Sequence, residues 1–165
     1  MKEDDEWAAT PMIIFKQTVI RHVIWQKEVR HVYGIKDRVQ CAGIEFNAQG
    51  MPYEFGRSLL QSDVNVKGKR RCLGASGCCF LIKREKFLEL GGFDENFHNG
   101  WEDNDFTVRM LEAGGIAVYN PEAKIKHLYA GSEGRFDEED QNVNKFLAKW
   151  IGSNVGIVEE ARKRL

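Results

Sequence analysis

The sequence has no long apolar run. No stretch of its 165 residues approaches the roughly 20 consecutive apolar residues that a membrane-spanning helix needs. Residues 1–6 are acidic, whereas a signal peptide would begin with basic and then apolar residues. We therefore predict a cytoplasmic protein with no signal for insertion or export, and we leave open a peripheral position at the cytoplasmic face of the membrane.

An excess of charge of either sign is also missing. Lys and Arg total 24 and Asp and Glu total 25, so the formal net charge is −1. A nearly neutral chain has no general attraction to nucleic acid or to an anionic membrane surface. Nucleic acid is therefore not an expected partner. The hydrophobic content of 42% and the chain length are sufficient for one globular domain with a core.

The cysteines lack the spacing of a zinc site. The chain has four of them, and none is arranged in the paired CxxC motifs that bind structural zinc: Cys41, Cys72, Cys78 and Cys79. We expect reduced thiols, as is usual in the cytoplasm. Cys78 and Cys79 fall within an apolar run and are predicted to lie in a buried strand.

The first third of the chain favours strands. Residues 1–10 are acidic and are expected to be frayed, and short strands are expected at 12–15 and 18–20. Residues 22–33 are ambiguous between strand and helix, and their β-branched and aromatic residues favour strand. Residues 39–46 alternate weakly and end at a turn signal.

The most continuous apolar run lies at residues 74–82. It is short and bounded by glycines, which is typical of a central strand covered on both faces. We therefore predict an α/β domain whose mixed sheet is centred on residues 76–82. The small residues at the start of the run, Ser76 and Gly77, would allow a ligand to approach closely.

Helical periodicity and turn residues predict the other elements. Helices are expected at 83–90, 103–113 and 138–150, strands at 116–119 and 123–128, a polar loop at 56–69, and a short charged helix or tail at 158–165.

One acidic motif precedes the second of these helices: Gly100-Trp101-Glu102-Asp103-Asn104-Asp105. Acids at a helix N-terminus are favoured by its unpaired N–H groups and macrodipole, so Asp103 and Asp105 would serve as caps. Alternatively, Trp101 and the Glu-Asp pair form an acceptor platform and a general base. The residues alone leave both interpretations open.

A series of motifs in one order resembles the C-terminal half of the GT-A glycosyltransferases of family 2. The resemblance covers residues 39–150 and is most specific between 74 and 127. Its motifs are Gly77-Cys78-Cys79-Phe80-Leu81-Ile82, Gly91-Gly92-Phe93-Asp94-Glu95, Gly100-Trp101-Glu102-Asp103 with Arg109, and Tyr119-Asn120-Pro121-Glu122-Ala123 with His127.

The resemblance implies a partial GT-A fold and an inverting transfer of a sugar from a nucleotide-sugar donor to a hydroxyl of a carbohydrate acceptor. Asp103 would be the general base that accepts the hydroxyl proton. Glu102 would hold the acceptor, and Trp101 would offer a flat apolar face to a sugar ring.

The same resemblance suggests a role for His127. It is similar to a His that, in part of the family, helps bind Mn²⁺ or Mg²⁺ under the donor diphosphate, where the metal stabilises the leaving group. A His at a strand end that pairs with a backbone carbonyl is the alternative, since hard cations prefer oxygen ligands. Ser132 and Arg135 occupy the place of a loop that would close on the donor phosphates, or of a loop with no such role.

The first half of the family domain has no counterpart here. That half carries the nucleotide-binding units and an Asp-x-Asp metal motif, and Asp103-Asn104-Asp105 stands at the acceptor motif instead. We divide the chain into a poorly matched segment at 1–38, the family's C-terminal half at 39–150 and a tail at 151–165. The expected partners are the two substrates and either a separate donor-binding half or a second copy. The alternative function is a non-catalytic carbohydrate-binding or assembly module.

Overall fold

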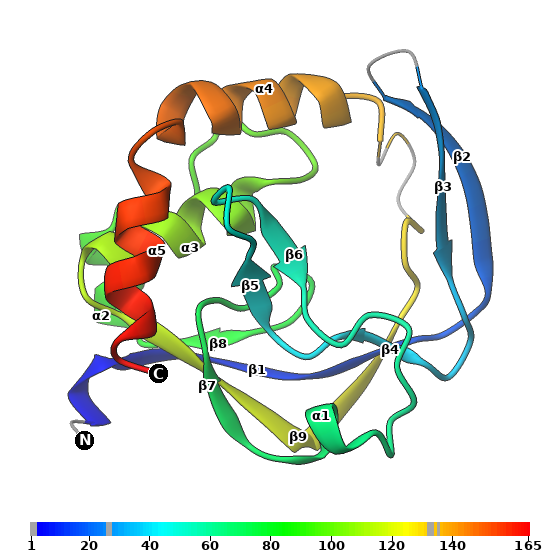
Figure 1. The fold of residues 1–165 in the computed structure, drawn as a ribbon, viewed down its shortest axis with the longest axis horizontal. Coiled ribbons are helices and arrows are strands. Elements are labelled where there is room, and N and C mark those ends of the chain that lie inside the picture. The colour runs from blue at the N-terminus through cyan, green and yellow to red at the C-terminus, as the bar shows by residue number, and fades with distance from the viewer. Residues whose placement is uncertain (1–2, 26–27, 132–133, 135) are drawn as a thin grey trace.

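The computed structural model describes residues 3–25, 28–131, 134 and 136–165. Its main sheet is mixed, in the order β4-β1-β9-β7, with β8 also paired to β1. The two central strands, β1 (Glu6–Phe15) and β9 (Ile116–His127), run parallel for most of their length. They cross the molecule side by side in Figure 1. The sequence prediction of an α/β fold with a mixed sheet is confirmed, and the arrangement is consistent with a partial GT-A fold.

Short antiparallel strands complete both edges of this sheet. β8 (Leu81–Ile82) pairs with the first half of β1, and β4 (Val39–Cys41) pairs with its second half. β7 (Arg70–Cys72) pairs with β9 on the opposite side. The carboxyl ends of β1 and β9 therefore meet at one edge, where β9 ends at His127.

The predicted sheet centre at residues 76–82 is wrong. Only β8 is a strand there, on the sheet edge, and residues 76–80 form a turn in which Cys78 is exposed. The apolar character of the run has another cause, since the ring of Phe80 packs against those of Phe93 and Phe106. Periodicity cannot distinguish packing against a helix from burial within a sheet.

The expected fraying of residues 1–10 is also wrong from Glu3 onward. Asp5 and Glu6 both form ion pairs with Arg71, and the short helix η1 (Glu3–Asp5) leads directly into β1. The two strands expected at 116–119 and 123–128 are one strand, β9, which continues through Pro121 with a register shift opposite Pro11 and Met12. A proline is tolerated at such an irregularity, because the ladder there is already interrupted.

The helices agree with the sequence predictions. α2 (Arg84–Glu89), α3 (Glu102–Glu112) and α4 (Glu139–Trp150) form where periodicity placed them, and the tail forms α5 (Asn154–Arg162). The loop expected at 56–69 contains a single turn, α1 (Val64–Lys67). Within the described part of the chain, no helix combines the length and apolarity needed to cross a bilayer.

Two hairpins stand beside the main sheet. β2 (Val19–Trp25) pairs with β3 (Glu28–Gly34), which confirms strand for the described part of residues 22–33. β5 (Ile44–Phe46) pairs with β6 (Pro52–Glu54), and Figure 1 shows this second hairpin in front of the sheet.

The core lies on both faces of the sheet, with α3 contributing to each side. On β1, Ile13 belongs to one buried cluster and Met12 to the other, as the two-residue period of a strand requires. On α3, Val108 joins the first cluster and Phe106 the second. This double packing fixes the position of the N-terminus of α3, where the acidic motif lies.

Candidate functional site

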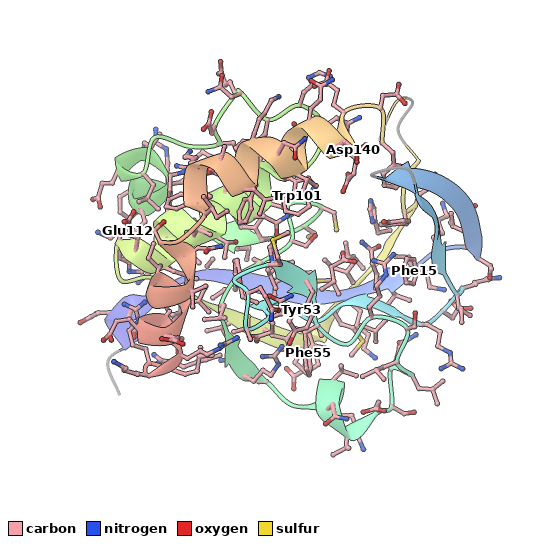
Figure 2. The ribbon with its side chains drawn as sticks, turned by 45° about the horizontal axis from the view of Figure 1, so that its top comes forward. Phe15, Tyr53, Phe55, Trp101, Glu112 and Asp140 are labelled. Atoms are coloured by element: carbon pink, nitrogen blue, oxygen red, sulfur yellow. The ribbon has the colours of Figure 1, made fainter. Side chains whose placement is uncertain are left out.

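A cleft of about 530 Å³ opens where the N-terminus of α3, the β5–β6 hairpin, the end of β9 and the start of α4 converge. Of the predicted site residues, it brings together Ser76, Gly77, Trp101, Glu102, Asp103 and His127. Two further predicted residues, Ser132 and Arg135, lie outside the described residues. Figure 2 shows two walls of the cleft, with Trp101 beneath α4 and Tyr53 on β6.

Asp103 is held in a defined orientation at the wall of the cleft. Its Oδ2 accepts a hydrogen bond of 2.7 Å from the backbone N–H of Gly77, and its Oδ1 accepts one of 2.8 Å from the N–H of Asn104. Burial raises the pKa of Asp103 to about 6, with Glu102 adding like-charge repulsion, although both N–H bonds oppose the rise. The carboxylate is thus more basic than an ordinary Asp yet ionised at neutral pH.

Trp101 adopts a strained backbone conformation. Its φ of 76° lies in the left-handed region, which a bulky residue seldom adopts, and its neighbours Asn99 and Gly100 also have positive φ. The indole Nε1–H donates to Glu139 on α4 at 2.9 Å, and the ring packs 5.3 Å from that of Phe146. Strain of this kind persists only where surrounding contacts enforce it, and it is concentrated at functional sites.

Glu102 has a buried carboxylate oxygen with no hydrogen-bond partner among the described residues. This Oε2 atom belongs to a cleft-lining side chain at the first position of α3. A buried acceptor without a donor carries a desolvation cost. Glu102 is therefore suited to receive a hydrogen-bond donor from a ligand.

Asp105 is structural, despite standing in an Asp-x-Asp triplet. Its side chain is fully buried and accepts hydrogen bonds from Arg109, Lys149 and the indole of Trp150. The capping interpretation is wrong for Asp105, and the N-cap residue of α3 is Trp101; Asp103 satisfies one N–H of the first turn, that of Asn104, through its Oδ1.

Arg109 connects the acidic motif with the preceding glycine turn. Its guanidinium donates to the carbonyls of Leu90 and Gly92 as well as to Asp105. The turn at Gly91-Gly92 and the first turn of α3 are thus fixed to each other.

His127 belongs to a hydrogen-bonded chain with Gln40 and Glu54. Its Nδ1 is 2.8 Å from the Oε1 of Gln40, and the Nε2 of Gln40 donates to Glu54 at 3.0 Å. Glu54 also pairs with Arg57, whose guanidinium lies 4.8 Å from the centre of the Tyr129 ring. Because a carboxylate only accepts, the amide of Gln40 must turn its oxygen toward His127, so Nδ1 carries the proton. One partner of His127 is thus the side-chain amide of Gln40, at Nδ1.

The residues around His127 do not by themselves form a metal site. No group of three or more His, Cys, Asp or Glu side chains within the described ranges is placed to hold an ion. Glu54, the nearest acid along the chain of contacts, is committed to Arg57 and Gln40. Mn²⁺ and Mg²⁺ need several oxygen ligands, which this set does not supply.

The sequence interpretation missed several lining residues. Gln40, Tyr53, Glu54, Tyr129 and Glu139 all face the cleft. The strands that carry Gln40 and Glu54 are three residues long, which is too short for periodicity to indicate a face. Glu139 carried a weak signal, because it stands in the first turn of α4, where acids are also common for structural reasons.

Known proteins show sequence similarity to part of this chain. A family model described as the N-terminal domain of galactosyltransferase matches residues 62–131. Two N-acetylglucosaminyl-diphospho-decaprenol L-rhamnosyltransferases, from Mycobacterium tuberculosis strains CDC 1551 / Oshkosh and ATCC 25618 / H37Rv, are each 43% identical over 60 residues. These alignments cover 36% of this chain and only 20% of each relative. The resemblance to a glycosyltransferase domain is thereby confirmed.

Proposed function

We propose that this chain, which resembles a glycosyltransferase domain, has an acceptor-side role in an inverting sugar transfer. The donor would be a nucleotide sugar and the acceptor a hydroxyl of a carbohydrate. The observation that carries this proposal is the oriented carboxylate of Asp103, whose Oδ2 is fixed by the N–H of Gly77 in the same cleft as Trp101 and Glu102. A positioned base beside an apolar ring is what activation of a sugar hydroxyl requires.

In this mechanism Asp103 accepts the proton of the acceptor hydroxyl. The acceptor oxygen then forms a bond to the anomeric carbon of the donor as the bond from that carbon to the nucleoside diphosphate breaks. Attack opposite the leaving group inverts the anomeric centre. The pKa of about 6 suits Asp103 to this role, because a base works best when its pKa lies near the working pH.

The negative charge of the cleft favours binding of a sugar acceptor over binding of the donor diphosphate. The described lining residues include Glu54, Glu102, Asp103 and Glu139 but no Lys or Arg. A donor diphosphate would meet like charges there, so its binding needs cationic groups from elsewhere. We propose that a separate donor-binding segment supplies them, with a divalent cation for which His127 would be one ligand. That cation would stabilise the leaving diphosphate.

The relatives agree with a sugar acceptor. By name, they transfer L-rhamnose to N-acetylglucosaminyl-diphospho-decaprenol. The proposal for this chain is limited to the class: a sugar hydroxyl is the nucleophile. A non-catalytic carbohydrate-binding module is the second candidate, favoured by the aromatic and hydrogen-bonding character of the cleft, and it would have no need of the base.

The test uses Asp103→Asn in the complete enzyme, with this chain assembled with its donor-binding part. The amide keeps the shape of the side chain but lacks the basic lone pair, so transfer should fall about 10²- to 10⁴-fold. Glu112→Gln is the matched control, because Glu112 is exposed at the other end of the same helix and should leave turnover unchanged. Near-normal turnover in Asp103→Asn would remove Asp103 from the mechanism and favour the binding module.

A second measurement tests the division between donor and acceptor sides. Calorimetric titration of this chain alone with nucleoside diphosphates, with and without Mn²⁺, should detect only weak binding, in the millimolar range. Micromolar binding would show that the donor site is already present in this chain.

A further inference from the structure

The charged side chains that line the cleft are mostly acidic, and this bears on the class of sugar that it can bind. Four carboxylates line it, Glu54, Glu102, Asp103 and Glu139, and the one basic side chain among the described lining residues is His127. Glu54 is paired with Arg57, whereas Glu102 and Asp103 on α3 line the cleft beside Trp101.

The carboxylate of Glu102 determines which kind of ligand group can bind beside it. Its Oε2 is buried and has no hydrogen-bond partner among the described residues, whereas Asp103 beside it accepts two backbone N–H bonds and Glu139 accepts the indole N–H of Trp101. An ionised carboxylate oxygen can only accept. A ligand group that hydrogen-bonds to the Glu102 carboxylate at the cleft wall must therefore be a donor, such as a hydroxyl or an ammonium group.

An anionic group on the sugar would be repelled by Glu102 instead of forming a hydrogen bond with it. A carboxylate or phosphate brought beside Glu102 has no proton to donate, and its charge is poorly screened in a partly buried site. Like charges placed together are a device for rejecting the wrong partner. The indole of Trp101 accepts any sugar face of suitable shape, so it does not discriminate by charge.

We propose that the cleft selects an acceptor ring that is neutral or carries an amine, and that Glu102 is the residue that rejects anionic sugars. This inference rests on the proposed function, because it takes the cleft to be the acceptor site. It assigns a specificity role to Glu102 in addition to holding the acceptor.

The test measures binding to this chain as it stands. The indole N–H resonance of Trp101 reports on the cleft and is assigned by its loss in Trp101→Phe. The probes are methyl glycosides of glucose, galactose and mannose, each compared with its C6-oxidised uronide at pH 7.5. We expect the neutral glycosides to shift the resonance at millimolar concentration and the uronides to bind about tenfold more weakly or worse, from like-charge repulsion at a few ångströms.

Two variants distinguish an effect of Glu102 itself from an effect of the net charge of the chain. Glu102→Gln should reduce the discrimination about threefold or more, because it removes the charge and adds a donor. Glu112→Gln makes the same change in net charge outside the cleft, and Figure 2 labels Glu112 at the far end of α3 from Trp101. It should leave the discrimination unchanged.

The possible results distinguish the selectivity, the acceptor site and the role of Glu102. Equal binding of glycosides and uronides would overturn the selectivity and leave the proposed function intact. A Trp101 resonance that none of the sugars shifts would overturn the acceptor site itself, and the selectivity with it. Discrimination that persists in Glu102→Gln would overturn the assignment to Glu102.

Discussion

The backbone N–H of Gly77 donates to the carboxylate of Asp103 at 2.7 Å, across 26 residues of sequence. This bond joins the turn before β8 to the N-terminus of α3 and directs Oδ2 of the proposed base. The approach is close: a Cβ at Gly77 would lie 3.0 Å from the Cβ of Asp103 and 3.2 Å from its Oδ2. Glycine at position 77 therefore sets where the carboxylate stands.

Gly77→Ala should displace the base without unfolding the chain. The added methyl group pushes against Asp103, and a misplacement of about 1 Å costs on the order of 10²-fold in rate. We expect kcat/KM of the complete enzyme to fall about 10- to 100-fold, while the free energy of unfolding changes by less than about 1 kcal/mol at this exposed turn.

Gly156→Ala is the control for that substitution. Gly156 lies within α5, and a Cβ there meets no atom within 4 Å. It should raise the free energy of unfolding by about 0.5 to 1 kcal/mol through helix propensity and leave activity unchanged. Normal activity in Gly77→Ala would show that the contact with Asp103 does not position the base.

The raised pKa of Asp103 predicts how stability depends on pH. The folded pKa is about 6 against an ordinary aspartate value of 3.8, so the folded chain binds the proton more tightly than the unfolded chain. Asp103 therefore destabilises the fold as pH rises through this window, and the cost is fully present above the folded pKa. By linkage, the cost at pH 7.5 exceeds that at pH 4.5 by about 2 kcal/mol.

Urea unfolding of wild type and Asp103→Asn across this range isolates the effect, because the amide does not titrate. The free energy of unfolding of the variant relative to wild type should rise by about 2 kcal/mol from pH 4.5 to 7.5. A difference that stays flat with pH would mean that the pKa of Asp103 is not raised. The same titration should appear in the complete enzyme as a loss of kcat/KM below a pH of about 6.

Asp105, two residues further along, should stabilise the fold. It is fully buried and is the common acceptor for Arg109, Lys149 and Trp150. Removing one member of a buried ionic network leaves the others without compensation and costs about 3 to 5 kcal/mol. Asp105→Ala should lower the free energy of unfolding by that amount in urea denaturation at neutral pH.

Asp94→Asn is the comparison. Asp94 also pairs with Lys149, which holds the pKa of that carboxyl at about 2, but its side chain is 22% exposed. By linkage the lowered pKa of Asp94 contributes about 2 kcal/mol at neutral pH, so its loss should cost about that much, which is less than the loss of Asp105. If the two variants were equally stable, Asp105 would not be the centre of the network.

The sequence predicted the helices and the acidic motif but not how distant segments meet. α3 was predictable because Phe106 and Met110 recur at helical spacing within one continuous segment. The bond from Gly77 to Asp103 depends on the topology of the sheet, and no local pattern encodes it. The apolar run at 76–82 was assigned to the sheet centre because burial against aromatic side chains and burial within a sheet produce the same composition.

The positions of Gln40 and Glu54 were unpredictable for another reason. Each stands on a strand of three residues, and they are brought together by a hydrogen bond between their side chains. Polar residues on such short strands look the same whether they face solvent or a cleft. The motif that carried the resemblance was recognisable because its residues are adjacent in sequence.

The hydrogen bonds of Gln40 determine the tautomer of His127. Gln40 is 2% exposed, and its amide joins Glu54 to the Nδ1 of His127. The acceptor-only carboxylate of Glu54 orients the amide, so neutral His127 should carry its proton on Nδ1 and its lone pair on Nε2. Two-bond ¹H–¹⁵N spectra of the imidazole at pH 8 distinguish the tautomers directly.

In Gln40→Leu the orienting amide is lost, and the Nε2–H tautomer should become populated. Circular dichroism and urea unfolding would show whether the fold survives the loss, which should cost about 1 to 3 kcal/mol because a buried polar network is left partly unsatisfied. Glu54→Gln keeps the shape of the side chain but allows the amide of Gln40 to flip, because the new amide can also donate. Both tautomers of His127 should then be populated, with a smaller loss in the free energy of unfolding than in Gln40→Leu. A wild-type spectrum that already shows the Nε2–H form would contradict this arrangement of the Gln40 amide.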